Sequence, residues 1–329
     1  MTLRPLSFWA CCLGFAFASL SCRNTPDAPP TAPTVDYAAV VSPQFNSDSA
    51  YSFVAAQVAF GPRVPGSAAA DRCADYLVSK LSQWADTVIV QPFSSTLWDK
   101  TTVRGRNIIA SFNTDNNNRV VLAAHWDSRL WADHDTDSTK WHTPILGAND
   151  GASGVGLLLE VARCIASQSL DKGVDIIFFD LEDQGVPEWS HTYVDDSWCL
   201  GSQYWATHPH QPCYSARYGI LFDMVGTPQP RFTKEQISVQ YASSILDNIW
   251  AAARSLGFSN IFVDQKTDPI LDDHLYVNRH TSIPMADIVQ HSPQGNFFPF
   301  WHTVKDDMQS VDRRTLSIVG TVTLKVLYL

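Results

Sequence analysis

The 329-residue sequence has no excess of basic residues, because 23 Lys and Arg residues stand against 33 Asp and Glu residues, giving a formal net charge of −10. No basic stripe is present, which argues against a nucleic-acid-binding protein. Long charged tracts, low-complexity tracts and internal repeats are also absent, so nothing favours disorder. With 45% apolar and 12% aromatic residues, the composition instead indicates a globular protein with a large core.

No apolar run is long enough to cross a membrane comfortably, since the longest, residues 6–20, is short and lies at the N-terminus. Residues 1–22 place Arg4 before this run and end in small residues and Cys22, which resembles a bacterial lipoprotein signal. A simple export signal cut after residues 16–18 is the alternative. We expect a periplasmic protein that is attached to the membrane only through a lipid on Cys22.

Residues 23–35 contain four prolines and predict a semi-extended tether, so the folded domain is expected over residues 36–329. The domain has only four cysteines. Cys73 and Cys164 fall on the apolar faces of predicted helices and should be buried thiols. Cys199 and Cys213 flank a loop-like stretch, and they either form a disulfide or stay free.

The apolar pattern predicts an α/β fold: a single-domain three-layer sandwich with a central mixed, mostly parallel sheet flanked by helices. Residues 36–85 show helical periodicity, broken by "FGPRVPGS" at 60–67. Further helices are expected at about 153–168, 241–256 and 315–329. Strands are expected at 86–93, 105–112, 119–126, 174–180, 219–225 and 284–289.

The ends of these strands carry acidic and imidazole side chains. The strand at 119–126 leads into His125 and Asp127, "IIFFDLED" ends in Asp180, Glu182 and Asp183, and "GILFD" ends in Asp223. Further groups lie in "GANDGASG" (147–154, with Asp150), "LDDH" (271–274, with Asp272) and "FWHT" (300–303, with His302). Taken singly, each motif has an ordinary explanation, such as a helix N-cap at Asp150 or a structural histidine.

Together, however, these groups would meet at the carboxyl edge of one sheet, where ligands bind in such folds. Packed carboxylates raise each other's pKa unless a cation lies among them. Oxygen and imidazole donors without a thiolate are typical of a catalytic zinc site. The sequence therefore predicts a zinc enzyme.

The motifs "AAHWDSR", "GANDGASG", "FFDLED", "FDMVG", "DDH" and "WHT" follow one another in the order found in the zinc-aminopeptidase-like family, and the match spans roughly residues 50–329. Within that family the chain most resembles the animal-type glutaminyl cyclases, which convert an N-terminal glutamine into pyroglutamate and release ammonia. The resemblance implies a single-domain fold, a peptide or protein substrate with N-terminal glutamine, and one zinc per chain. We also expect a monomer.

The resemblance further implies a role for individual residues. Asp150, Asp183 and His302 would bind zinc, although animal cyclases carry Glu at the position of Asp183. Glu182 would be the general acid/base. The remaining implied site residues are two hydrogen-bonding carboxylates and two tryptophans that wall the substrate pocket: Asp223, Asp272, Trp189 and Trp301.

The main alternative is a two-metal zinc aminopeptidase, because all five ligand positions of that class are present: His125, Asp150, Asp183, Asp223 and His302. Asp272 in "LDDH" and Trp301 before the histidine of "WHT" favour the cyclase. A third possibility, a lipoprotein that only binds peptides, conflicts with the complete ligand set and the presence of Glu182. For each tryptophan, simple core packing is the alternative.

Overall fold

The computed structural model describes residues 35–329, so the predicted signal at 1–22, with Cys22, and nearly all of the tether at 23–35 lie outside the described residues. Residues Asp36–Leu329 form one compact unit. Within the described residues, no helix has the length and apolar character needed to cross a membrane.

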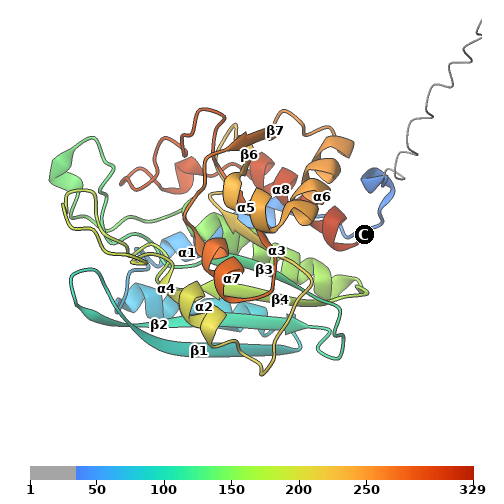
Figure 1. The fold of residues 1–329 in the computed structure, drawn as a ribbon, viewed down its shortest axis with the longest axis horizontal. Helices are drawn as coiled ribbons and strands as arrows, with labels where there is room; N and C mark the ends of the chain where they lie inside the picture. Colours follow the sequence, from blue (N-terminus) through green and yellow to red (C-terminus); the bar gives the residue numbers. More distant parts are fainter. Residues whose placement is uncertain (1–34) are drawn as a thin grey trace, which may run out of the picture. The chain divides into compact units, whose positions relative to one another are not determined.

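A six-stranded mixed sheet runs through the centre of this unit (Figure 1). Four neighbouring strands are parallel, and two antiparallel pairings extend the sheet at one edge. A second, two-stranded sheet pairs two short segments. The strands of the main sheet, in spatial order, are β1 (Thr87–Thr96), β2 (Thr102–Phe112), β4 (Gly173–Phe179), β3 (Arg119–His125), β5 (Gly219–Asp223) and β8 (Met285–Val289); the small sheet pairs β6 (Phe232–Glu235) with β7 (Phe262–Thr267).

Helices cover both faces of the sheet, which confirms the three-layer prediction. Two helices, α4 and α7, lie side by side on one face (Figure 1), and α5 packs against β8 and α7. Five helices pack on the opposite face. The five helices on that opposite face are α1 (Ser47–Ala59), α2 (Ala68–Leu81), α3 (Ala152–Ser167), α6 (Ser243–Ser255) and α8 (Arg313–Leu327). The other three helices are α4 (Leu200–Thr207), α5 (Gln236–Tyr241) and α7 (Asp273–His280). Short 3₁₀ turns span Tyr37–Ala39, Ser138–Lys140 and Met308–Ser310.

The two helical layers explain why β4 is apolar along its whole length. Ile176 and Phe178 point into the core beneath α1, α3 and α8, whereas Ile177 and Phe179 point into the core beneath α4 and α7. All four side chains are fully buried. A strand covered on both faces loses the usual alternation of apolar and polar residues.

The predicted elements are present with small shifts at their ends, for example α6 at Ser243–Ser255 instead of 241–256. Cys73 and Cys164 are buried as predicted. The disulfide alternative for Cys199 and Cys213 is wrong, because both thiols are free and Cys213 is exposed. The pattern did not reveal β6, β7, α4, α5 or α7, since all five are short.

A buried ion pair ties β4 to its neighbours at the end of the sheet opposite the predicted site. Arg119 donates from Nε and Nη2 to the two carboxylate oxygens of Asp175, at 2.7 and 2.8 Å. Ser111 and Tyr214 each donate a hydroxyl to the same carboxylate, both at 2.6 Å. Burial alone would raise the pKa of Asp175, but these partners outweigh it and hold the pKa below its usual value.

We predict that Asp175→Asn lowers the free energy of unfolding by about 3–5 kcal/mol at neutral pH, because it leaves the buried Arg119 charge without its partner. Urea or thermal unfolding would measure the loss. Since the native pKa of Asp175 is depressed, its contribution should be present above the unfolded-state pKa and fade as the pH falls towards the native value. Asp247→Asn, at an exposed pair with Lys234, is the control and should change stability by less than about 1 kcal/mol; equal losses in the two variants would contradict the prediction.

Candidate active site

The predicted site residues converge where the chain direction changes within the sheet. From β3 the chain crosses through α3 to β4 on one side, and from β4 it crosses through α4 to β5 on the other side. The loops that follow these strands therefore leave in opposite directions and form a crevice at the carboxyl ends, which is where open α/β sheets bind ligands. His125 ends β3, Asp223 ends β5, and Glu182 and Asp183 follow β4.

The turn after β4 is held in a sharp conformation. Leu181 has φ 57°, a left-handed value that non-glycine residues rarely adopt. The carboxylate of Asp180 accepts the backbone N–H of Leu181 at 2.9 Å and that of Arg106 at 2.8 Å. Asp180 therefore shapes the turn and is not one of the metal-ligand candidates.

Asp127 fixes the backbone that carries the two key carboxylates. It accepts the N–H of Glu182 at 3.1 Å, the N–H of Asp183 at 3.2 Å and the side-chain amide of Gln184 at 3.0 Å. Its Oδ1 also lies 3.6 Å from Nδ1 of His125. One fully buried carboxylate thus orients groups from β3 and from the loop after β4.

A second buried carboxylate, Asp306, orients the loop before α3. It accepts the backbone N–H of Asn149 at 2.8 Å and of Asp150 at 3.0 Å. The N-cap of α3 is Gly151, with φ 88° and no side-chain capping bond. The N-cap alternative for Asp150 is therefore wrong, and its side chain is free for another partner.

Asp150, Asp183 and His302 come together as a group that could hold a metal ion. Nε2 of His302 lies 2.9 Å from Oδ1 of Asp183 and 3.5 Å from Oδ2 of Asp150, and Oδ2 of each aspartate is buried without a hydrogen-bond partner. Burial raises the pKa of Asp183 well above its usual value, and the neighbouring Asp150 charge adds to the effect. A cation would relieve this repulsion.

The imidazole of His302 is suited to bind such a cation. Burial, with the nearby Arg129 guanidinium, lowers its pKa to about 3, so the ring is neutral. Its Nδ1 lies 3.5 Å from Asp133, whose carboxylate is held by Arg129 at 3.0 Å. A carboxylate behind the ring is the usual device that orients a histidine ligand. Two carboxylates and one neutral imidazole fit a catalytic zinc.

A second group of potential ligands shares Asp150 with the first. Nε2 of His125 lies 3.0 Å from Oδ1 of Asp150 and 3.2 Å from Oδ1 of Asp223, and the three residues satisfy the same spacing. The fold therefore brings together the three ligand candidates expected for a one-zinc cyclase and the five expected for a two-zinc aminopeptidase.

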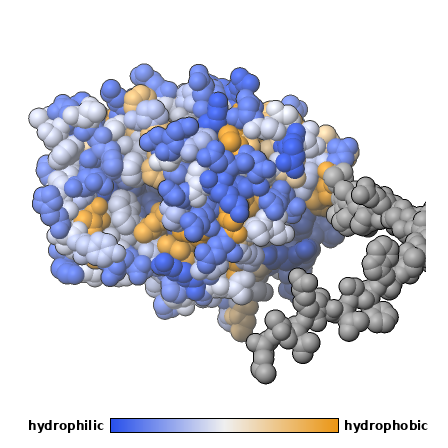
Figure 2. Space-filling view, turned by 45° about the horizontal axis from the view of Figure 1, so that its top comes forward, coloured by the Kyte–Doolittle hydropathy of each residue, from blue (hydrophilic) through white to orange (hydrophobic). Residues whose placement is uncertain are grey.

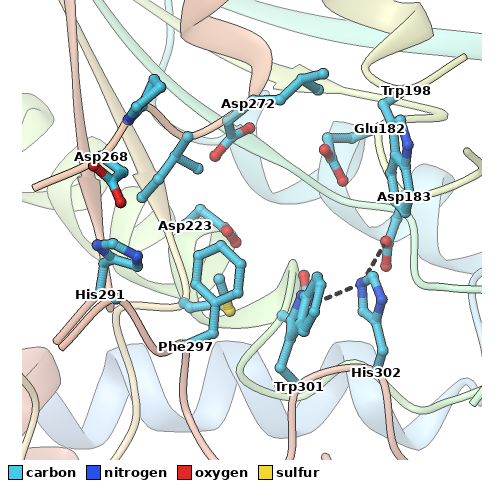
Figure 3. Close-up of a pocket in the computed structure, with 16 residues that line it drawn as sticks. Glu182, Asp183, Trp198, Asp223, Asp268, Asp272, His291, Phe297, Trp301 and His302 are labelled. Atoms are coloured by element: carbon cyan, nitrogen blue, oxygen red, sulfur yellow. Dashed lines mark ion pairs between the residues drawn. The ribbon is translucent and has the colours of Figure 1, made fainter. Parts of the chain in front are cut away.

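These groups open into a pocket of about 410 Å³. Figure 3 shows Glu182 and Asp272 on the wall above Asp223, with Trp301 next to His302. The lining contains six carboxylates and no Lys or Arg. The face of the molecule shown in Figure 2 is mostly hydrophilic, with apolar residues in small groups. Seven of the eight predicted site residues line the pocket: Asp150, Glu182, Asp183, Asp223, Asp272, Trp301 and His302.

Trp189 is the exception, because it does not line this pocket. Instead it packs in an aromatic cluster with Trp131, Trp141 and His142, at ring distances of 5.8, 6.2 and 4.5 Å. Trp198 lies in the pocket wall and stacks on His302 at 5.9 Å. No local motif distinguishes the two tryptophans, so their positions depend on the path of the loop.

A family model for peptidase family M28 matches residues 107–327, which contain every ligand candidate. The chain belongs to peptidase family M28.

Among solved structures, a Zn-dependent exopeptidase from Parabacteroides distasonis is 49% identical, with a TM-score of 0.86 over 88% of this chain and 99% of that chain. A glutaminyl cyclase from Bacteroides thetaiotaomicron, bound to N-acetylhistamine, is 46% identical, with the same TM-score and coverage. Glutaminyl-peptide cyclotransferase from Bos taurus is 25% identical over 66% of this chain, but the match spans only 63% of the bovine protein.

We predict that Asp127→Asn weakens zinc binding by about 10–100-fold, the usual loss when a residue that orients metal ligands is changed. The asparagine keeps one acceptor oxygen, so its NH2 group would face the N–H of either Glu182 or Asp183 and remove that hydrogen bond. Competition with a chelator of known affinity would measure the change. Asp137→Asn, at an exposed 3₁₀ N-cap, is the control; unchanged zinc affinity in Asp127→Asn would show that Asp127 does not orient the ligand loop.

Proposed function

We propose that the chain is a zinc-dependent glutaminyl-peptide cyclotransferase, which converts the N-terminal glutamine of a peptide or protein into pyroglutamate and releases ammonia. The observation that carries the proposal is the near full-length similarity to the Bacteroides thetaiotaomicron glutaminyl cyclase. The pocket supports it, since all of the proposed ligands and Glu182 face one cavity.

The lining of the pocket suits an N-terminal glutamine. Six carboxylates without a Lys or Arg favour the positive charge of a free α-ammonium group and disfavour an N-terminal glutamate. Trp198, Phe297 and Trp301 provide apolar walls for the short methylene chain of glutamine. A peptide can therefore enter by its amino end, with the glutamine side chain folded back towards its own nitrogen.

Asp150, Asp183 and His302 would hold one zinc per chain. Zinc bound there would act as a Lewis acid on the γ-amide carbonyl of the substrate. Behind these ligands, Asp127, Asp306 and Asp133 keep the three donors in place.

Glu182 moves the protons. It precedes ligand Asp183 in sequence, but its own Oε2 is directed towards His125 Nδ1, 3.8 Å away. Burial raises the pKa of Glu182 well above its usual value, partly offset by His125 and reinforced by Asp183. A carboxylate with a raised pKa can take a proton from the α-amine and later deliver it to the departing amide nitrogen.

Asp223 and Asp272 would bind the amine and amide hydrogens of the substrate. Burial, with the charge of Asp150, raises the pKa of Asp223 to about 8. Asp272 is the N-cap of α7 and accepts the N–H of Asp273, so the helix fixes its orientation in the pocket wall.

A two-metal aminopeptidase is the second candidate, favoured by the group of His125, Asp150 and Asp223 and by the similarity to the Parabacteroides distasonis exopeptidase.

The proposal also includes export to the periplasm, a lipid anchor on Cys22 and a monomeric state. The sequence of residues 1–22 supports export and the anchor, and the mostly hydrophilic face in Figure 2 supports the monomer.

We predict that the purified protein converts a Gln-initiated peptide into its pyroglutamyl product, with one ammonia released per product. A Leu-initiated peptide of otherwise identical sequence should remain intact. Mass spectrometry distinguishes the loss of ammonia from the loss of a whole residue. Trimming of the Leu-initiated peptide, with no ammonia from the other, would favour the aminopeptidase.

We predict that Glu182→Gln retains one zinc per chain but loses at least about 100-fold in kcat, because the amide keeps the shape of the side chain and cannot transfer the proton. Elemental analysis and steady-state kinetics would test both parts. If the variant keeps more than about a tenth of the wild-type rate, Glu182 does not carry out the proton transfer.

We predict that Trp301→Ala raises KM for the Gln-initiated peptide by an amount equivalent to about 1–3 kcal/mol, since an apolar wall is lost. Zinc content should not change. Trp189→Ala, which alters a tryptophan outside the pocket, is the matched control and should keep a KM near that of the wild type. If Trp301→Ala instead loses zinc or unfolds, its stacking on His302 at 3.9 Å is structural.

A further inference from the structure

The carboxylate of Glu182 has few hydrogen-bond donors around it. Within residues 35–329, the thiol of Cys199 is the one side chain that donates a hydrogen bond to it, with Sγ 3.3 Å from Oε1. The other oxygen, Oε2, lies 3.8 Å from His125 Nδ1, beyond hydrogen-bond distance. One oxygen of the proposed base is thus held, and the other is free.

We propose that Cys199 is a positioning residue for the reaction, whose thiol holds Oε1 of Glu182 and so leaves Oε2 free to take and return the proton. This inference rests on the proposed function of Glu182. In the first step an N–H bond of the substrate α-amine breaks, an O–H bond forms at Oε2, and the amine nitrogen bonds to the γ-amide carbon. In the last step the bond between that carbon and the amide nitrogen breaks, and the proton on Oε2 passes to the departing nitrogen, which leaves as ammonia. The S–H bond of Cys199 stays intact throughout.

The backbone around Cys199 is arranged to place this thiol. Its N–H donates to the carbonyl oxygen of Glu182 at 2.8 Å, and the next N–H, of Leu200, donates to that of Leu181 at 3.0 Å. Two bonds therefore fasten the start of α4 to the turn after β4. The thiol and the carboxylate are carried by backbone segments that cannot separate without breaking these bonds.

Cys199 also adopts an unfavourable conformation that serves no capping function. It has φ 58° and occupies the N-cap position of α4, yet its side chain makes no capping bond. Ser, Asp or Asn would usually stabilise such a helix start. A left-handed non-glycine residue persists where its surroundings impose it, often at functional sites. Here the side chain is directed to Glu182 instead of to the helix N-terminus.

Complete burial suits the thiol to act as a donor. Cys199 is 0% exposed and packs with Leu275, Tyr276 and Trp198. Burial raises the pKa of the thiol well above its usual value, and the charge of Glu182 adds to the effect, so the thiol keeps its hydrogen. A hydrogen bond in such a buried position is stronger than one in water.

The test compares Cys199→Ala, Cys199→Gly and Cys199→Ser on a Gln-initiated peptide. Ala and Gly remove the donor, and each should lower kcat about tenfold, as expected for one weak hydrogen bond to a charged group, with KM and zinc content unchanged. Gly also relieves the left-handed strain, so it should fold even if Ala does not. Ser restores a donor and should recover most of the loss in kcat.

Cys164→Ala is the matched control, because it removes another buried thiol. This thiol lies on α3, and none of its hydrogen bonds is with Glu182. Its kcat should equal that of the wild type. Wild-type kcat in Cys199→Gly, or an equal loss in Gly and Ser, would overturn the positioning role. Absence of any cyclase activity in the wild type would instead reject the proposed function itself.

Discussion

The structure depends on burying several carboxylates at one edge of a sheet without a matching number of basic side chains. Backbone N–H groups solve much of this problem. Asp127 accepts those of Glu182 and Asp183, and Asp306 accepts those of Asn149 and Asp150. These two aspartates are satisfied within the protein. By contrast, Oδ2 of Asp150 and Oδ2 of Asp183 have no hydrogen-bond partner, and the two side chains lie with His302 in one group that could hold a metal ion. A cation bound there would offset the repulsion between the two carboxylates.

The same constraint explains where the backbone is strained. Leu181, Cys199, Met224 and His302 all have left-handed φ values, between 48° and 58°, and each lies in or beside the pocket or the turn that forms it. Such conformations are unfavourable for residues with a Cβ and are retained where packing fixes them. After the sharp turn at Leu181, Asp183 lies beside His302, whereas Oε2 of Glu182 is directed towards His125.

Sequence reasoning identified most of the fold and the site because both follow from local patterns. Apolar runs indicated the main strands, and the residues just after them had to meet at one edge. It did not identify the function of Asp306, because Asp306 contacts Asp150 across 156 positions in the chain. It also assigned Trp189 instead of Trp198 to the pocket, since loop paths are determined by tertiary packing. Cys199 was considered only for a disulfide, because its contact with Glu182 depends on a left-handed backbone that no sequence pattern indicates.

The two candidate reactions differ physically by little more than one charge. Asp150 belongs to both ligand groups, and His125 lies 3.0 Å from Asp150 and 3.2 Å from Asp223. A metal at that position would require a neutral imidazole and could activate water for peptide hydrolysis. A proton on His125 would instead offset one of the two carboxylate charges and compete with a second metal for the same place. Burial lowers the pKa of His125, but the neighbouring carboxylates of Asp127, Asp150 and Asp223 outweigh burial and raise the pKa well above its usual value. Whether a proton or a second metal lies between Asp150 and Asp223 is therefore the physical difference between the cyclase and the aminopeptidase.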